Sequence, residues 1–440
     1  MQQHILQDAF PNYEGGRKIQ LRDSDDGKDK LREAFSSEGN KPVFLYIDNA
    51  LHKKDLKQLL PEDLGCLPQH NRILITSRTK DIVDMLEERG FHDRIKDYPV
   101  ETLSDNDAMQ VLCKDHAIRD RIKDDLQNIV NVCKGIPLVL TVVGAKLRKQ
   151  KYDVSRCSRI IEDLKEGKEI RDLSHRLFHF VYEELDEATQ EAFLDICCCF
   201  NDKERRFVEY IVGAEEVTIL EEAALITPVM VQSNPWSWEE EEEEEERLTV
   251  HDIIRSIGRT LAKSSRIVDA NAWAEAEKDE ARLKRVKTVC FSGDKNYILE
   301  ERHFNSMKES LRILVWGGSI NVSVPYAVTL PEIRWARISG GFSWLNVEAL
   351  HKLASLWCRN LPTQQRKLPK SLRRLSIFTQ PAATRDLLNI VPNSSLEDLN
   401  LSFPDEDPSQ PFNEEEDNTT DIFNRFLRLQ DLINFKVSSN

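Results

Sequence analysis

The sequence predicts a multidomain α/β plus α fold, which combines a partial parallel-sheet domain, a helical bundle, a winged-helix domain and a short leucine-rich-repeat solenoid. Short runs of Val, Ile and Leu alternate with helical segments early in the chain, a long helical stretch follows, and the last part repeats an L-x-x-L-x-L pattern. A chain of 440 residues is also too long for one hydrophobic core, so several domains are expected.

Residues 1–100 are expected to form the α/β domain. Apolar strands are predicted at 43–48, 72–78 and 94–100, and helices at 28–35, 52–60 and 81–90. Strands rich in Val, Ile and Leu that alternate with helices indicate a parallel sheet covered on both faces. Ligands of such sheets bind beyond the C-terminal ends of the strands, where Asp48 and the triplet Thr76, Ser77 and Arg78 fall.

Residues 101–168 are expected to be helical. Ser104 and Asp107 fit a capping box at the start of one helix, and another helix stops at Lys134 and Gly135. Pro137 then stands just inside the start of the next helix, where its missing N–H group costs no hydrogen bond.

Residues 169–268 are predicted to form a winged-helix domain, because helices are followed by strand-like segments at 225–232 and 247–250. The run Glu239–Glu246 falls where the loop of the wing would be. Such a block of like charges repels itself, so we expect a solvated, disordered insertion, with binding of a basic partner as the alternative. The consecutive cysteines Cys197–Cys199 lack metal-ligand spacing and are expected to be inert core residues.

Residues 269–300 are assigned to a linker and residues 301–440 to leucine-rich repeats. The repeat pattern occurs at 311–316, 333–338, 353–358, 372–377 and 396–401, and again at 432–437 after an acidic spacer. The first five starts are spaced by about 20 to 24 residues, which is the period of leucine-rich repeats. One such repeat cannot bury its apolar row alone, so the repeats are expected to stack into a short, irregular solenoid.

The composition excludes several classes of protein. A net charge of -15 argues against nucleic acid as a partner, because phosphate binding needs clustered Lys and Arg. No apolar run is long enough to span a membrane, and no secretory signal precedes the first domain. Nine cysteines, an odd number, do not suggest a disulfide framework, so we expect reduced thiols and a cytoplasmic location, with the nucleus as the alternative.

The order of motifs resembles the NB-ARC leucine-rich-repeat proteins of plant innate immunity, a class of nucleotide-switched disease-resistance receptors. The segment VFLYIDNA (43–50) is similar to the Walker B strand of that family, and RILITSR (72–78) to its arginine-bearing strand. KGIPLVL (134–140) resembles the G-L-P-L motif, with Ile136 in place of leucine. VHD (250–252) resembles the methionine-histidine-aspartate motif, with valine first.

This resemblance implies a site for ADP or ATP with Mg²⁺. Asp48 would hold Mg²⁺ or its water, and Arg78 would contact the terminal phosphate. Pro137, in the same motif as Gly135, would pack on the adenine, and His251 would reach the β-phosphate of ADP. In such receptors ADP holds a closed form, exchange for ATP opens it, and the repeats recognise a protein partner.

The sequence departs from the family at the phosphate loop. No G-x-x-x-x-G-K-[ST] pattern precedes Asp48, so we expect a chain that begins downstream of this loop. Asn49 also replaces a second acidic residue and cannot act as a general base, so we expect no ATP hydrolysis.

Two functions remain open at this point. The chain could act as an ADP/ATP-dependent switch in defence signalling, or as a nucleotide-independent scaffold or decoy that binds proteins through its repeats. Each site residue also has a structural alternative: Asp48 as a helix cap, Arg78 as a surface ion pair, Pro137 as a helix-start proline and His251 as a capping or core histidine. The sequence does not indicate an oligomeric state, an N-terminal signalling domain or the ligand of the repeats.

Overall fold

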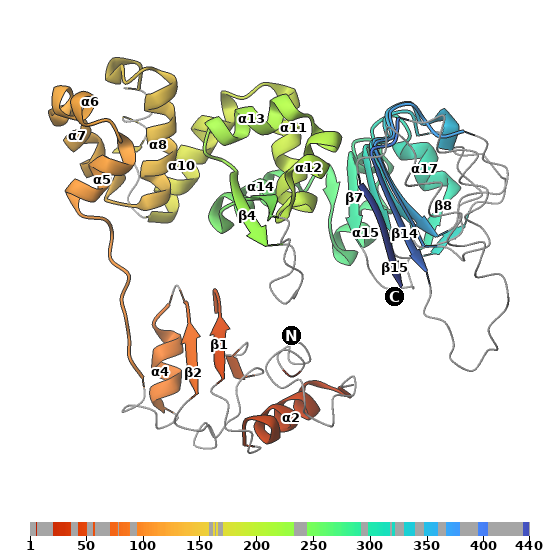
Figure 1. The fold of residues 1–440 in the computed structure, drawn as a ribbon, viewed down its shortest axis with the longest axis horizontal. Coiled ribbons are helices and arrows are strands. Elements are labelled where there is room, and N and C mark those ends of the chain that lie inside the picture. Colours follow the sequence, from red (N-terminus) through yellow and green to blue (C-terminus); the bar gives the residue numbers. More distant parts are fainter. Residues whose placement is uncertain are drawn as a thin grey trace. The chain divides into compact units, whose positions relative to one another are not determined.

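In the computed structural model the chain folds as two compact units, Met1–Glu101 and Thr102–Asn440 (Figure 1). The structure describes residues 6, 21–36, 43–50, 56–57, 71–77, 79–88, 95–157, 162, 164–165, 170–232, 244–291, 298–316, 319–321, 330–338, 347–359, 367–378, 395–403 and 434–439. None of the helices in these ranges combines the length and the apolar character needed to cross a membrane.

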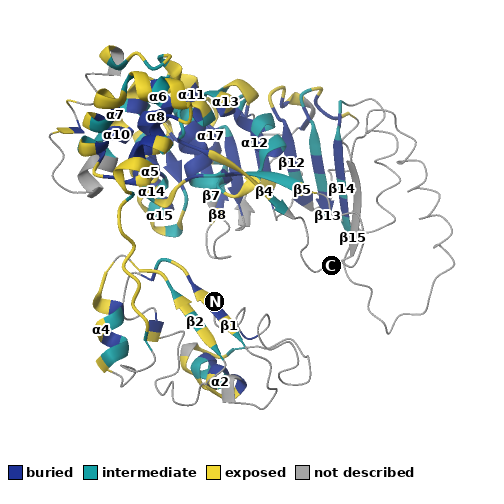
Figure 2. Ribbon diagram, turned by 60° about the vertical axis from the view of Figure 1, so that its left-hand side comes forward, coloured by how far each residue is buried: buried dark blue, intermediate teal, exposed yellow. Residues whose placement is uncertain are grey.

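The first unit contains the two predicted strands as a parallel pair, β1 (Phe44–Ile47) and β2 (Arg72–Ile75). The predicted helices α2 (Ser24–Ser36) and α4 (Asp81–Glu88) accompany them. Leu45 and Ile47 on one face of β1 share a small apolar core with residues of both helices. Residues on the other face, including Phe44 and Tyr46, are exposed, because strand residues alternate between the two faces (Figure 2).

The third predicted strand, at 94–100, is wrong for its described part. Residues 95–100 form no strand, and Tyr98 and Val100 are 80% and 89% exposed. Pro99 has no N–H group to donate to a sheet, and the charged Lys96 and Asp97 leave few apolar residues to bury. Of the helix predicted at 52–60, only residues 56–57 belong to the described part, and they are helical.

The second unit begins with the predicted helical part. Its helices are α5 (Asp105–Leu112), α6 (His116–Arg121), α7 (Lys123–Cys133), α8 (Pro137–Lys149), the short η3 (Val154–Cys157) and α10 (Ile170–Glu183). Ser104 caps α5 as expected, because its side chain accepts a hydrogen bond from the Asp107 N–H group. The predicted helix end at Lys134 and Gly135 is confirmed by left-handed backbone at both residues.

Further helices and a hairpin follow in the segment for which a winged-helix domain is predicted. They are α11 (Glu187–Asp195) with its π-helical continuation η4 (Ile196–Phe200), β3 (Lys203–Glu204), α12 (Arg205–Val212), α13 (Ala214–Glu222), β4 (Thr227–Gln232), β5 (Glu244–Thr249) and α14 (Asp252–Ala262). The strands β4 and β5 pair antiparallel, and β3 pairs with β5.

The expectation that Glu239–Glu246 forms a disordered insertion is wrong for its last residues. Glu244, Glu245 and Glu246 belong to β5 and pair with residues of β4, while Glu239–Glu243 lie outside the described residues. Positive charges elsewhere in the fold offset the repulsion between these carboxylates. Arg205 lies 3.1 Å from the Glu246 carboxylate, and Arg247 lies 3.4 Å from that of Glu245.

The prediction of a linker at 269–300 is also wrong for its described residues. They follow β6 (Arg266–Ile267) and form the helices α15 (Ala270–Ala276) and α16 (Glu280–Leu283) and the strands β7 (Thr288–Phe291) and β8 (Ile298–Glu300). Trp273 is fully buried in the second large core of the unit, together with Leu283 and Val289. The apolar residues of this segment are therefore structural, although their spacing matches neither a long helix nor the repeat pattern.

Each predicted repeat segment forms a strand that begins at its third residue. These strands are β9 (Ile313–Trp316), β11 (Trp335–Ile338), β12 (Ser355–Arg359), β13 (Arg374–Phe378), β14 (Asp398–Phe403) and β15 (Asn434–Ser439). Other elements in this part are α17 (Glu301–Met307), η5 (Val347–Ala349) and β10 (Ser319–Asn321). The strand β10 pairs with β8. The six repeat strands, together with β6 and β7, build an eight-stranded sheet in the order β15-β14-β13-β12-β11-β9-β7-β6. Every neighbouring pair is parallel.

One row of residues crosses this sheet and contacts the helices and hairpin that follow α10. We call α5–α14, together with this hairpin, the helical part. The strand register aligns Arg266, Thr288, Ile313, Trp335, Ser355, Arg374 and Asp398, which we call the junction row. The Trp335 ring packs on Phe200 and Phe207, at centroid distances of 5.1 and 5.3 Å. Further along the row, Arg374 forms an ion pair with Glu204 of β3. The helical part therefore rests along the sheet rather than at one end of it.

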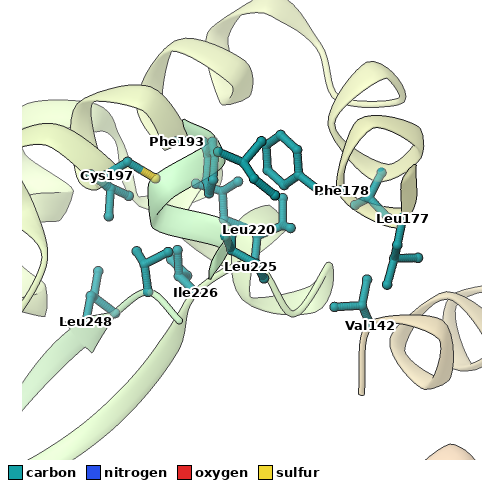
Figure 3. Packing of buried hydrophobic residues seen from close by; sticks show 14 of the residues in the cluster. Val142, Leu177, Phe178, Phe193, Cys197, Leu220, Leu225, Ile226 and Leu248 are labelled. Atoms are coloured by element: carbon teal, nitrogen blue, oxygen red, sulfur yellow. The ribbon is translucent and has the colours of Figure 1, made fainter. Parts of the chain in front are cut away.

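The larger core of the second unit is continuous from α5 to the hairpin. Phe193, Cys197 and Leu248 are fully buried in it, and Figure 3 shows them with side chains that lie far apart in the sequence, such as Val142 and Phe178. The expectation that Cys197–Cys199 are core residues is confirmed for Cys197, whereas Cys198 and Cys199 are partly accessible. Packing here is close, because a methyl group added at Gly258 of α14 would lie 2.6 Å from the Cys197 sulfur.

A buried ion pair anchors the first end of the junction row. The Arg266 side chain is 1% exposed and donates to Asp195 Oδ1 at 3.1 Å and to Glu191 Oε2 at 2.7 Å. The same Asp195 oxygen accepts a hydrogen bond from Thr288 Oγ1 at 2.7 Å. A carboxylate of α11 therefore joins β6 and β7 to the helical part.

We expect Asp195→Ala to lower the free energy of unfolding of the second unit by about 3 kcal/mol, because it removes one of the two carboxylates paired with the buried Arg266 and the acceptor of the Thr288 hydroxyl group. Chemical denaturation followed by tryptophan fluorescence measures this change. The control is Glu187→Ala, which removes an exposed acid from the same helix and should change stability by less than about 0.5 kcal/mol. Equal effects of the two substitutions would contradict the proposed role of Asp195.

Candidate functional site

Asp48 lies directly after β1 and points its carboxylate toward the neighbouring strand. Its Oδ1 atom accepts hydrogen bonds from Tyr46 Oη at 3.0 Å and from Thr76 Oγ1. The hydrogen bond from Thr76, more than that from Tyr46, lowers the pKa of the Asp48 carboxyl, so the group is ionised at neutral pH. The residue is exposed at the C-terminal end of the sheet, where ligands of parallel sheets bind.

Asn49 follows in left-handed backbone, with φ of 55°. Its N–H group donates to Thr76 Oγ1 at 2.8 Å, so Thr76 joins the ends of both strands. Arg78, the predicted phosphate contact, lies outside the described residues. Within the first unit, the structure thus brings Asp48 together with Thr76, whose role sequence reasoning had not specified.

Gly135 and Pro137 meet a strict backbone requirement. Gly135 has φ of +65°, and a Cβ atom placed there would lie 2.7 Å from the Leu103 carbonyl oxygen. The Leu103 N–H group donates to the Gly135 carbonyl at 2.9 Å, which fixes this close approach. Pro137 is the first residue of α8 and is exposed, so its ring is accessible to solvent.

His251 is the N-cap of α14. Its Nδ1 atom accepts a hydrogen bond from the Ile253 N–H group at 3.3 Å, which requires a neutral ring that carries its proton on Nε2. Although the residue is exposed, partial burial of the ring lowers the pKa of the imidazole, and the neighbouring Asp252 opposes this shift. The capping alternative for His251 is thus realised, and its Nε2–H group remains a donor that could face an anion.

The predicted site residues are divided between the two units. Asp48 belongs to the first unit, whereas Gly135, Pro137 and His251 belong to the second. Within the second unit, α8, which begins at Pro137, and α14, which His251 caps, both pack against α10, so α10 lies between these two helices (Figure 1). Among the described residues, no group of three or more His, Cys, Asp or Glu side chains could hold a metal ion.

A charged cleft of about 780 Å³ lies between the helical part and the sheet, a feature that sequence reasoning did not predict. Glu397 of the segment before β14 accepts hydrogen bonds from Arg206 at 2.6 Å and from Tyr210 at 2.7 Å. The wall of this cleft also includes Arg374, Asn400 and Glu244. The only signal in the sequence was the Arg205-Arg206 pair in an otherwise acidic region, which does not reveal its distant partners.

The Arg206–Glu397 pair is half-buried, so we expect a coupling free energy of about 1 kcal/mol between the two side chains. A double-mutant cycle with Arg206→Ala and Glu397→Ala, measured by denaturant unfolding, gives this value. The matched control cycle uses Lys284 and Glu280, an exposed pair within one turn of chain, for which we expect about 0.3 kcal/mol. Additive effects of Arg206→Ala and Glu397→Ala would mean that this ion pair does not stabilise the contact between α12 and the segment before β14.

The pH dependence of stability should reflect two histidines. His251 and the buried His303 both accept a hydrogen bond at Nδ1, and burial lowers the pKa of each ring in the folded state. Below the ordinary pKa of 6.5 the unfolded chain therefore binds more protons than the folded one. We expect the free energy of unfolding contributed by these groups to be fully present above pH 6.5 and to fall as the pH falls below it.

Denaturant midpoints measured between pH 7.5 and 5 test this expectation. His251→Asn retains a capping side chain but cannot titrate, so it should show a smaller loss of stability over this range than the unmodified chain. An unchanged slope in His251→Asn would show that His251 is not one of the responsible groups.

No protein-family model matches the chain. The TMV resistance protein N of Nicotiana glutinosa is 23% identical over 433 residues, which cover 91% of this chain and 35% of that protein. The disease resistance protein RUN1 of Vitis rotundifolia is 25% identical, over 56% of this chain and 17% of that protein. The disease resistance protein RML1B of Arabidopsis thaliana is 28% identical, over 42% of this chain and 18% of that protein.

The chain therefore spans about a third or less of the length of these relatives. The similarity to the first of them extends through both compact units. Since several proteins of this kind match independently, the resemblance drawn from the motifs is confirmed: the chain is related to plant disease resistance proteins.

Proposed function

We propose that the chain is part of a plant immune receptor and acts as an ADP/ATP-dependent switch in defence signalling. The relationship to plant disease resistance proteins over 91% of the chain carries this proposal. The repeat strands supply the protein-binding surface and the helical part supplies the nucleotide contacts. Hydrolysis of ATP is not part of the proposed mechanism, because Asn49 offers no general base.

The chemistry of three positions in the second unit fits bound ADP. Gly135 has a positive φ, and a side chain at this position would collide with the Leu103 carbonyl oxygen. The backbone of Gly135 is therefore bare, two residues before the accessible ring of Pro137. His251 stands at the N-terminus of α14, where N–H groups and the helix dipole favour an anion. With Nδ1 occupied, its Nε2–H group is the donor that would bind a phosphate oxygen.

Asp48 is the residue that would hold Mg²⁺ in this proposal. It is ionised, exposed and placed at the end of β1, and carboxylate oxygens are preferred ligands of this cation. One carboxylate oxygen is already engaged by Tyr46 and Thr76, as in sites where second-sphere hydroxyl groups orient a ligand.

The second candidate is a nucleotide-independent scaffold or decoy, and specific contacts favour it. His251 caps its own helix and Pro137 starts its own helix, so both have a structural role without a ligand. The sequence also lacks the G-x-x-x-x-G-K-[ST] loop, whose backbone N–H groups are the main phosphate contacts in nucleotide-binding domains.

Release of bound nucleotide distinguishes the two candidates. The purified, monodisperse chain is denatured and the adenine nucleotide released is quantified by chromatography. We expect ADP in near-stoichiometric amount, and a higher melting temperature when ADP and Mg²⁺ are added to protein that has been stripped of nucleotide. A folded chain that contains no nucleotide and shows no shift contradicts the switch and leaves the scaffold.

Two histidine variants make this test specific. His251→Ala should release much less ADP than the unmodified chain, because it removes the proposed phosphate donor. His351→Ala, which alters an exposed histidine before β12, should release the same amount as the unmodified chain. Equal losses in both variants would point to a general loss of folded protein instead of a lost contact.

A further inference from the structure

We propose that Cys199 and Cys290 form a peroxide-sensitive thiol pair, whose oxidation to a disulfide covalently joins the helical part of the second unit to its parallel sheet. Cys199 lies in η4, at the end of α11, and Cys290 lies in β7. This modification site is separate from the proposed nucleotide site and does not depend on it.

The backbone geometry places the two thiols together. The hydrogen bond of 2.7 Å between Thr288 Oγ1 and Asp195 Oδ1 fixes β7 against α11. Cys290 follows Thr288 by two residues and therefore lies on the same face of the sheet. Cys199 follows Asp195 by four residues and therefore lies on the same side of the helix. Both cysteines pack against the same core, and each thiol shifts the pKa of the other, which places their side chains side by side.

Accessibility distinguishes this pair from most of the other described cysteines. Cys199 and Cys290 are partly accessible, whereas Cys113, Cys133, Cys197 and Cys358 are buried. All of them are free thiols, and Cys198 is also partly accessible. Because these two residues are less enclosed than the four buried cysteines, a small, neutral oxidant such as hydrogen peroxide should react with them more readily.

The environment of Cys290 favours it as the attacking thiol. Contact with the Cys199 thiol lowers the pKa of Cys290, and the positive charges of Lys203 and Arg337 act in the same direction, against burial and Asp195. Arg337 is held nearby because its guanidinium lies over the Trp357 ring at 5.0 Å. Burial raises the pKa of Cys199, so Cys199 reacts with peroxide less readily than Cys290 and is left to attack the sulfenic acid beside it.

The reaction is balanced with one peroxide molecule. The Cys290 thiolate attacks peroxide, so that an S–O bond forms, the O–O bond breaks and the leaving hydroxide becomes water after taking up a proton. The Cys199 sulfur then attacks the Cys290 sulfenic acid, so that the S–S bond forms and a second water leaves. The two thiols lose two electrons, and hydrogen peroxide is reduced to two molecules of water.

Peptide mapping of the unmodified chain tests the proposal. The fully reduced, folded protein is treated with hydrogen peroxide, its remaining thiols are alkylated, and it is digested with trypsin. We expect residues 177–203 to be linked to residues 288–295, because cleavage after Lys or Arg leaves Cys199 and Cys290 in these two peptides. The linked mass should revert to the separate peptides after reduction.

Cysteine variants identify the sulfur atoms, since residues 177–203 also contain Cys197 and Cys198. Cys199→Ser and Cys290→Ser should each abolish the linked peptide, whereas the matched control Cys198→Ser should retain it. Oxidation should raise the melting temperature of the unmodified chain and of Cys198→Ser, reversibly with a reducing agent, and leave that of Cys290→Ser unchanged.

Other results would overturn the proposal. A linkage that persists in Cys199→Ser, a link of Cys290 to any other peptide, or stepwise over-oxidation of Cys290 without a disulfide would each exclude the Cys199–Cys290 pair. None of these outcomes bears on ADP binding, which is measured separately by nucleotide release.

Discussion

The buried carboxylate of Asp195 is the contact on which the arrangement of the second unit depends. It accepts from Arg266 of β6 and Thr288 of β7, while its helix α11 continues into the core through Phe193 and Cys197. Desolvating a carboxylate and a guanidinium is costly unless both are paired and their remaining hydrogen bonds are satisfied. Glu191 provides a second acceptor for Arg266, so the positive charge is matched from two sides.

From this anchor, the junction row changes in character across the sheet. The buried charge of Arg266 gives way to aromatic packing of Trp335 against Phe200 and Phe207. Beyond Trp335, the half-buried Arg374 pairs with Glu204 and with the buried Asp398. The last contacts border the charged cleft and are more exposed to solvent. Since exposed ion pairs contribute little and are screened by salt, this end of the junction should separate more easily than the anchored end.

This gradient relates the proposed function to the proposed thiol pair. A receptor that opens when nucleotide exchanges must release contacts between its parts at a modest cost in free energy. The half-buried pairs of Arg206 with Glu397 and of Arg374 with Glu204 provide such contacts. The Cys199 and Cys290 thiols lie beside the Asp195 anchor, so a disulfide there would hold the end that is already tight and leave the cleft free to change.

The sequence by itself determined the local elements, since the L-x-x-L-x-L segments, the Ser104 cap and the Gly135 turn each depend on the period or backbone freedom of neighbouring residues. It also indicated the candidate site, because Asp48, Gly135, Pro137 and His251 each belong to a short motif. Only the tertiary structure showed that the described residues between 269 and 300 contribute to the folded core and that Glu244–Glu246 belong to a strand. These outcomes, like the junction row and the Cys199–Cys290 contact, depend on partners far apart in the chain, whose proximity no local pattern records.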